Sequence, residues 1–120
     1  MAGDLPLLVL RDVDPAEVPL WVNAADAVLI PSEREGFGLA VLEALACNVP
    51  VLATPVGIAP SVLSDVAGTF CAPFDSDRWR EVLGGVLGGA DPRIEGREAA
   101  EAYSASRMAE RLLAAWRRMV

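Results

Sequence analysis

Residues 27–53 read AVLIPSEREGFGLAVLEALACNVPVLA, and this order predicts a strand, a loop, a helix and a second strand. Residues 27–30 form a continuous apolar run, typical of a strand buried on both faces. Residues 39–47 are apolar except at Glu43 and rich in Leu and Ala, which favours a helix buried on most sides. Residues 49–53 then form a second buried strand. The segment is therefore a βαβ unit with parallel strands and a right-handed crossover.

The flanking sequence continues this alternation. Residues 6–10 form a first apolar run, and Asp14, Pro15 and Glu17 are typical of a capped helix start, which predicts a helix over residues 15–25. After residue 53 we expect a short helix over 59–64, a strand over 68–72, a helix from Asp75 or Ser76 to about Leu87, a modest helix over 91–103 and a last helix from Ser104 or Ser106 to Met119. The fold class is α/β, a Rossmann-like parallel sheet of about four strands flanked by helices.

The last helix is amphipathic, and its cations suit its position. Arg117 and Arg118 lie in its final turn, where positive charge complements the helix dipole. Its apolar side consists of Met108, Leu112, Leu113, Trp116 and Met119. Because all three tryptophans (21, 79 and 116) have apolar neighbours at helical positions, we expect core or interface packing for them rather than sugar stacking.

Length and composition limit the function classes. The 120 residues suit one compact domain, so we treat 1–120 as a single domain. No apolar run approaches the roughly 20 residues that a bilayer requires. A net charge of -7 argues against nucleic acid as a partner, because phosphate backbones are bound mainly by surplus Lys and Arg.

The absence of two residue types excludes several mechanisms. The sequence contains no His and no Lys, which rules out a His general base, a His-ligated metal site, a lysine Schiff base and a P-loop lysine. Cys47 and Cys71 do not form a CxxC pair and lie in apolar stretches, so we expect buried free thiols. Free thiols fit a reducing compartment, and we expect a cytoplasmic protein.

The loop before the central helix suits an anion. The first N–H groups of a helix lack intrahelical acceptors and lie at the positive end of its dipole. Gly36 and Gly38 allow the backbone to approach a phosphate without an intervening Cβ. A GxG loop also serves plain chain reversal, so this signal needs support from other residues.

Two carboxylates supply that support. Glu43 lies in the second turn of the apolar helix, where a buried carboxylate needs a partner; alternatively it faces solvent or pairs with Arg34. Glu35 lies in the loop, where the simple alternative is a solvated charge. Carboxylates accept hydrogen bonds from sugar hydroxyls, so an anion site flanked by two of them describes a nucleotide sugar.

Residues 31–47, PSEREGFGLAVLEALAC, resemble the E-x7-E signature of the retaining glycosyltransferases of family four. Matching segments flank this motif at Ala24-Ala25-Asp26, Val49-Pro50-Val51 and Thr54-Pro55-Val56-Gly57, and residues 106–116 resemble the family's C-terminal helix. The resemblance covers nearly the whole chain. It implies the later part of the C-terminal, donor-binding domain of a GT-B enzyme.

The resemblance also implies roles for individual residues. Glu35 would be the catalytic-site carboxylate that holds donor-sugar hydroxyls, and Glu43 would hold the ribose hydroxyls. Phe37, Gly38 and Leu39 would present backbone N–H groups to the distal phosphate of the donor, with Gly36 completing the loop. The family transfers the sugar with retention and needs no tightly bound metal, so no cofactor is expected besides the nucleotide-diphosphate sugar. Departure of the diphosphate would be stabilised electrostatically.

The chain departs from the family pattern in several places. The Arg and Lys pair that clamps the diphosphate lies earlier in the family and has no counterpart here. Ile58 replaces a second glycine after Gly57, and Ser61 replaces a glutamate. Asn48 replaces a further glycine, but Asn also tolerates the left-handed conformation that follows a helix.

These departures affect the expected activity and partners. Each charge-assisted contact is worth about 1.5–3 kcal/mol, so the chain alone should bind a diphosphate weakly and be inactive. We expect a catalytic partner domain or chain, and exposed apolar surface that favours homo-oligomers. The sequence leaves peripheral membrane contact open. The alternative function is a non-catalytic module for assembly or nucleotide sensing, which Ile58, Ser61 and the missing clamp favour and the intact Glu35 and Glu43 oppose.

Overall fold

The computed structural model describes residues 5–120 as an α/β fold. Its elements in chain order are α1 (Val18–Ala24), β1 (Val28–Ile30), α2 (Leu39–Ala46), β2 (Val51–Ala53), α3 (Ala59–Leu63), β3 (Phe70–Cys71), α4 (Ser76–Leu87), α5 (Arg97–Glu101) and α6 (Ala105–Met119). The strands pair in parallel in the order β1-β2-β3. The predicted fold class and the βαβ unit from β1 through α2 to β2 are therefore confirmed.

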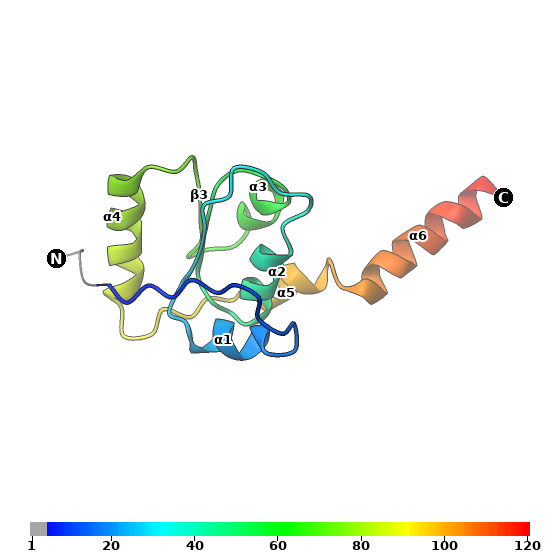
Figure 1. Cartoon of the computed structure of the whole chain (residues 1–120). Helices are drawn as coiled ribbons and strands as arrows, with labels where there is room; N and C mark the ends of the chain where they lie inside the picture. Colours follow the sequence, from blue (N-terminus) through cyan, green and yellow to red (C-terminus); the bar gives the residue numbers. More distant parts are fainter. Residues whose placement is uncertain (1–4) are drawn as a thin grey trace.

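Helices cover both sides of the small sheet. In Figure 1, α4 lies on one side of the strands, while α2 and α3 lie on the other. Helix α5 packs along α2, and α1 contacts α2 as well. The core lies between the sheet and α2, where Ala44, Leu45 and Val51 have no exposed surface. The buried side chains of β2 match the prediction of a strand enclosed on both faces.

The sheet is smaller than the sequence suggested. Residues 5–120 contain three strands instead of about four, and the apolar run at residues 6–10 pairs with none of them. Its side chains are exposed, with Leu7 at 72%. Strand β1 is only partly buried, because no described residue pairs with its outer edge. A strand needs a partner as well as apolar side chains, and the sequence shows only the side chains.

Several helix ends follow their predicted caps. The Asp75 side chain accepts a hydrogen bond from the Arg78 N–H at the start of α4, and Ser104 accepts one from Arg107 at the start of α6. Helix α1 is shorter than predicted. Asp14 accepts from the Ala16 N–H in a local turn, so the helix begins at Val18 rather than at residue 15.

The segment at residues 91–103 differs most from the prediction, because only Arg97–Glu101 is helical. Asn48 has a φ of 57°, which confirms the left-handed position after α2. Its side-chain oxygen accepts hydrogen bonds from the N–H groups of Gly96 and Arg97, both at 3.0 Å, and its carbonyl accepts from Ile94. These bonds tie the segment to the end of α2 instead of to its own helical turns.

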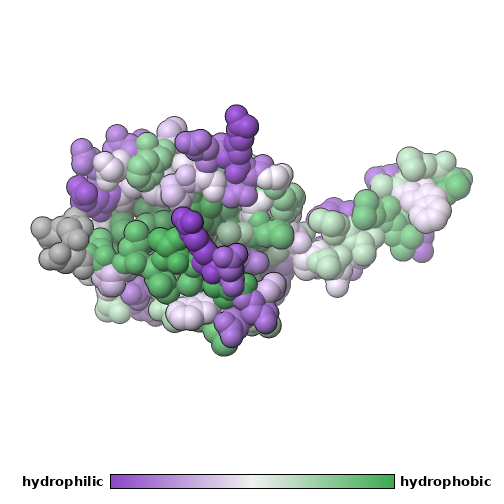
Figure 2. Space-filling view, viewed as in Figure 1, coloured by the Kyte–Doolittle hydropathy of each residue, from purple (hydrophilic) through white to green (hydrophobic). Residues whose placement is uncertain are grey.

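Helix α6 projects away from the rest of the molecule (Figure 1), and the described chain including this helix has a longest dimension of 61 Å. Its apolar side is exposed at Met108, Leu112, Leu113, Trp116 and Met119. Figure 2 shows this apolar surface along the helix and a second apolar area on the body. The packing expected for the tryptophans therefore holds for Trp79 at 4% exposure, but within the described chain Trp21 and Trp116 are exposed. No helix in the described part is long and apolar enough to cross a membrane.

Candidate functional site

Two loops meet at the carboxyl end of the sheet. Residues 31–38 follow β1 and residues 54–58 follow β2, and these parallel strands are neighbours. Ligands of open α/β sheets bind outside this end of the strands. The Thr54 N–H donates to the Ile30 carbonyl at 3.1 Å, and the Ile58 N–H donates to the Phe37 carbonyl at 2.7 Å. The second loop therefore supports the first at both of its ends.

Two glycines permit this close contact. Gly38 has a φ of 105° and Gly57 a φ of 59°, conformations that L side chains rarely adopt. A Cβ on Gly57 would lie 2.5 Å from the Phe37 carbonyl oxygen, and one on Gly38 would lie 3.3 Å from Ile58 Cγ2. A Cβ on Gly36, by contrast, would meet nothing within 4 Å. Gly38 and Gly57 are therefore required by the backbone, whereas the space in front of Gly36 is open.

The N-terminus of α2 has donors available for a ligand. Its N-cap is Gly38, which offers no side chain to accept from the first turn. The backbone N–H groups of Phe37, Gly38 and Leu39 donate to no acceptor within residues 5–120. Three free donors at the positive end of a helix dipole can bind an anion.

Glu35 lies on the exposed side of the loop. The Ser32 hydroxyl donates to its Oε1 at 2.7 Å, a length typical of a hydrogen bond to a carboxylate. Ser32 is held in turn by Thr54, whose buried hydroxyl donates to the Ser32 carbonyl. The carboxylate of Glu35 is therefore oriented by the loop and still open to solvent.

Glu43 lies on the open face of α2, with Leu39 and Ala40 beside it at helical spacing. It is exposed, which corrects the interpretation of a buried carboxylate in need of a partner. Of the two simple alternatives, solvent exposure is the one observed, because the ion pairs of the described chain do not include Arg34. A rise of about 1.5 Å per residue places Glu43 about 6 Å along the helix from Leu39.

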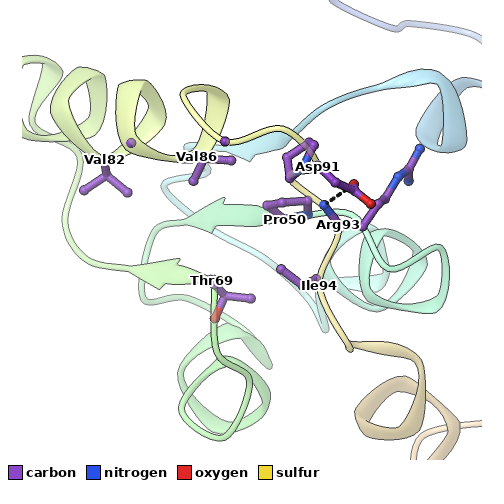
Figure 3. A pocket seen from close by; sticks show the side chains of 11 residues that line it. Pro50, Thr69, Val82, Val86, Asp91, Arg93 and Ile94 are labelled. Atoms are coloured by element: carbon purple, nitrogen blue, oxygen red, sulfur yellow. Dashed lines mark hydrogen bonds between the residues drawn. The ribbon is translucent and has the colours of Figure 1, made fainter.

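A hollow of about 470 Å³ lies elsewhere (Figure 3). Pro50, Val82, Val86 and Ile94 line it, at the amino ends of β2 and β3. Its polar groups already have partners: the Arg93 N–H donates to Asp91, and the Thr69 hydroxyl bonds within its own loop. The open loop at Glu35 is the stronger candidate, because it lies at the carboxyl end of the sheet and its N–H groups have no acceptor among the described residues. Within residues 5–120, no group of three or more His, Cys, Asp or Glu side chains could hold a metal ion.

A parallel sheet with a glycine loop that begins a helix at its carboxyl end is the arrangement with which Rossmann-like α/β domains bind phosphate groups. A match to the family described as Glycosyl transferases group 1 covers residues 7–102. The chain belongs to this family, and its relatives are enzymes that transfer sugars.

Named relatives agree with the family. The chain is 42% identical over 102 residues to a D-inositol 3-phosphate glycosyltransferase of Xylanimonas cellulosilytica, covering 84% of this chain and 24% of the relative. It is 39% identical over 105 residues to the enzyme of that name from Mycobacterium marinum, covering 82% of this chain and 22% of the relative. The chain therefore spans about a quarter of the length of these relatives.

A solved structure has the same fold. The sucrose-phosphate synthase of Thermosynechococcus elongatus superposes with a TM-score of 0.77 at 26% identity, over 92% of this chain and 29% of that one. This likeness confirms the predicted GT-B architecture.

The structure also adds three residues to the site: Ser32, Thr54 and Gly57. The sequence alone assigns no contact to Ser32 or Thr54. Their hydrogen bonds join residues 22 to 24 positions apart, so only the pairing of β1 with β2 brings them together. The single sequence signal is a polar residue just after each of the two strands: Ser32 lies two positions after β1, and Thr54 directly follows β2.

Proposed function

We propose that the loop at residues 35–38 and the start of α2 bind the donor, a nucleotide-diphosphate sugar. Glu35 accepts hydrogen bonds from donor-sugar hydroxyls, and Glu43 accepts them from the ribose. The N–H groups of Phe37, Gly38 and Leu39 receive the distal phosphate, and Gly36 leaves room for it. The observation that carries this proposal is a glycine-capped helix N-terminus with free donors between two exposed carboxylates, neither of them in an ion pair among the described residues.

The E-x7-E pair belongs to a retaining reaction. As the donor bond breaks, negative charge develops on the diphosphate, and the α2 N–H groups and dipole stabilise it without reorganising. Glu35 is the catalytic-site carboxylate, because it holds the sugar at the reacting end of the donor. The site needs no resident metal, and its own residues supply donors and acceptors only.

The chain alone is inactive in this proposal. Its cations are all Arg, and none lies within the loop except Arg34. A partner domain or chain supplies the missing positive charge and the acceptor site, which fits a chain that spans a quarter of its relatives. We place the protein in the cytoplasm, where the free thiols of Cys47 and Cys71 would stay reduced. Homo-oligomers form through the exposed apolar surfaces.

A non-catalytic nucleotide-sensing module is the second candidate. Ile58 favours it, because its side chain lies against Gly38 and its bulk replaces the small residue of the family pattern. A sensing module binds the nucleotide without turnover even when a basic partner is supplied. The donor-binding proposal predicts turnover under that condition.

Titration with a panel of nucleotide sugars tests the proposal. The panel comprises UDP-glucose, UDP-N-acetylglucosamine, GDP-mannose and ADP-glucose. Binding of each is measured by calorimetry and by amide chemical shifts of the labelled chain. Glu43→Ala and Glu35→Ala should each weaken binding about tenfold or more, the loss of a charge-assisted hydrogen bond. Glu33→Ala is the matched control, because Glu33 is an exposed carboxylate of the same loop. Binding that Glu43→Ala leaves unchanged would contradict the role of Glu43.

A further inference from the structure

We propose that Ser32 is a positioning residue for Glu35, and that it sets the preference of the site for a nucleotide sugar over the free nucleoside diphosphate. This inference rests on the proposed function, in which Glu35 contacts the sugar and the loop N–H groups contact the phosphate. Ser32 itself touches neither part of the donor. It acts through the carboxylate it orients.

The contact between Ser32 and Glu35 is short and local. The Ser32 hydroxyl donates to Glu35 Oε1 at 2.7 Å, across three residues of the loop. Glu35 is exposed, and a long exposed side chain ordinarily samples many rotamers. A hydroxyl bonded to one carboxylate oxygen reduces that freedom and leaves the second oxygen for a sugar hydroxyl.

Ser32 can hold Glu35 because Ser32 is itself fixed. The buried Thr54 hydroxyl donates to the Ser32 carbonyl, and the Thr54 N–H donates to the Ile30 carbonyl. Thr54 is 7% exposed and directly follows β2, so Ser32 is anchored to the end of a sheet strand. The orientation of Glu35 is therefore linked to the pairing of β1 with β2.

The far end of the loop is held separately. The Ile58 N–H donates to the Phe37 carbonyl at 2.7 Å, next to the N–H groups that face the phosphate. Loss of the Ser32 hydroxyl should therefore free the Glu35 side chain without moving the phosphate end. This separation predicts a selective effect on the sugar part of the donor.

Paired titrations measure that selectivity. Amide chemical shifts give the Kd of UDP-glucose, UDP-N-acetylglucosamine, GDP-mannose and ADP-glucose, and of UDP, GDP and ADP, for the wild type, Ser32→Ala and Ser32→Thr. In Ser32→Ala the ratio of the nucleotide Kd to the nucleotide-sugar Kd should fall roughly tenfold, while the nucleotide Kd stays within about twofold. Ser32→Thr keeps a hydroxyl and should restore the ratio. An unchanged ratio, or equal weakening of both ligands, would overturn the proposal.

A ligand-free measurement separates this proposal from the function it rests on. Side-chain NMR relaxation of Glu35 should report restricted motion in the wild type and in Ser32→Thr, and free rotamer averaging in Ser32→Ala. Glu33 is the internal reference, because the structure gives its side chain no hydrogen-bond partner in the described chain. If Glu35 is as mobile as Glu33 in the wild type, Ser32 does not position it. If Glu35 is restrained but no probe binds, the donor proposal fails and the selectivity assigned to Ser32 fails with it.

Discussion

The two glycines of the candidate loop, Gly36 and Gly38, differ in whether the fold requires a glycine at their position. Gly38 has a left-handed backbone and contacts Ile58, so its conformation belongs to the fold. Gly36 has neither a positive φ nor a neighbour that a Cβ would meet within 4 Å. A glycine with no structural requirement, beside free N–H donors, fits the proposed phosphate site, where a ligand would need that space.

Two alanine substitutions test this difference. Gly38→Ala should destabilise the fold by about 1–2 kcal/mol, because Ala is strained at positive φ and its Cβ crowds Ile58. Gly36→Ala should change the free energy of unfolding by less than about 0.5 kcal/mol but weaken nucleotide binding. Urea unfolding and UDP titration measure the two effects. Unchanged binding by a folded Gly36→Ala variant would argue against a phosphate in front of that residue.

Burial raises the pKa of the Cys71 thiol above its ordinary value of 9.0. The folded state thus holds the thiol proton more tightly than the unfolded state. As pH rises past 9.0, the unfolded chain loses that proton first, so stability falls until the folded thiol also titrates. Urea unfolding from about pH 7 to about pH 10 should show this decline in the wild type and in Cys47→Ser. Cys71→Ser should lack this part of the slope; an identical decline in Cys71→Ser would exclude Cys71 as its source.

At the scale of elements, two local capping signals were reliable. Asp75 caps α4 and Ser104 caps α6, because each side chain accepts from an N–H group three residues later. The start of α1 and most of the segment at 91–103 were predicted wrongly. At α1, a hydrogen bond from the Ala16 N–H to the Asp14 side chain replaces the first helical turn, and both residues are local. At 91–103, hydrogen bonds to Asn48 replace the first turn, and Asn48 is far away in the sequence.

Asn48 joins α2 to α5 in two ways. Its left-handed φ ends α2, and its side-chain oxygen binds the Gly96 and Arg97 N–H groups. Asn48→Gly keeps the backbone conformation and should cost about 1–3 kcal/mol for the lost acceptor. Asn48→Ala should cost about 1 kcal/mol more, because Ala also resists positive φ. Urea midpoints at constant m-value measure both; equal stability of the wild type and Asn48→Gly would show that the side-chain bonds contribute nothing.

At the scale of the whole molecule, the site was predictable in part. The sequence placed Glu35 and the glycines in a loop between a strand and a helix and Glu43 on that helix, and the structure has them at these positions. The exposure of Glu43 was not, because the apolar composition of α2 suggests burial while one face of this helix has no cover in the described chain. The partial burial of β1 and the exposed apolar side of α6 were not predictable for the same reason. Which other elements pack against a strand or a helix is not a local property of its sequence.

Charge and apolar area on α6 both favour association. Four Arg and one Glu give this helix a net charge of +3, whereas the whole chain carries -7, so the remainder carries -10. Its apolar side includes Leu112 at 66% and Trp116 at 63% exposure. An exposed apolar helix of positive charge and an acidic body with its own apolar area are complementary between two copies.

We therefore expect the wild-type chain to exceed its monomer mass of 12.7 kDa at high concentration. Size-exclusion chromatography with light scattering, across the roughly µM–mM range, measures this mass. Leu112→Glu places a charge on the apolar side and should shift the chain to monomer. Ala114→Glu introduces the same charge on the polar side of α6 and should leave association unchanged, so the pair separates burial of the apolar side from a general effect of charge. A wild-type chain that stays monomeric at the highest concentration would contradict the prediction, and equal dissociation by both variants would assign association to charge alone.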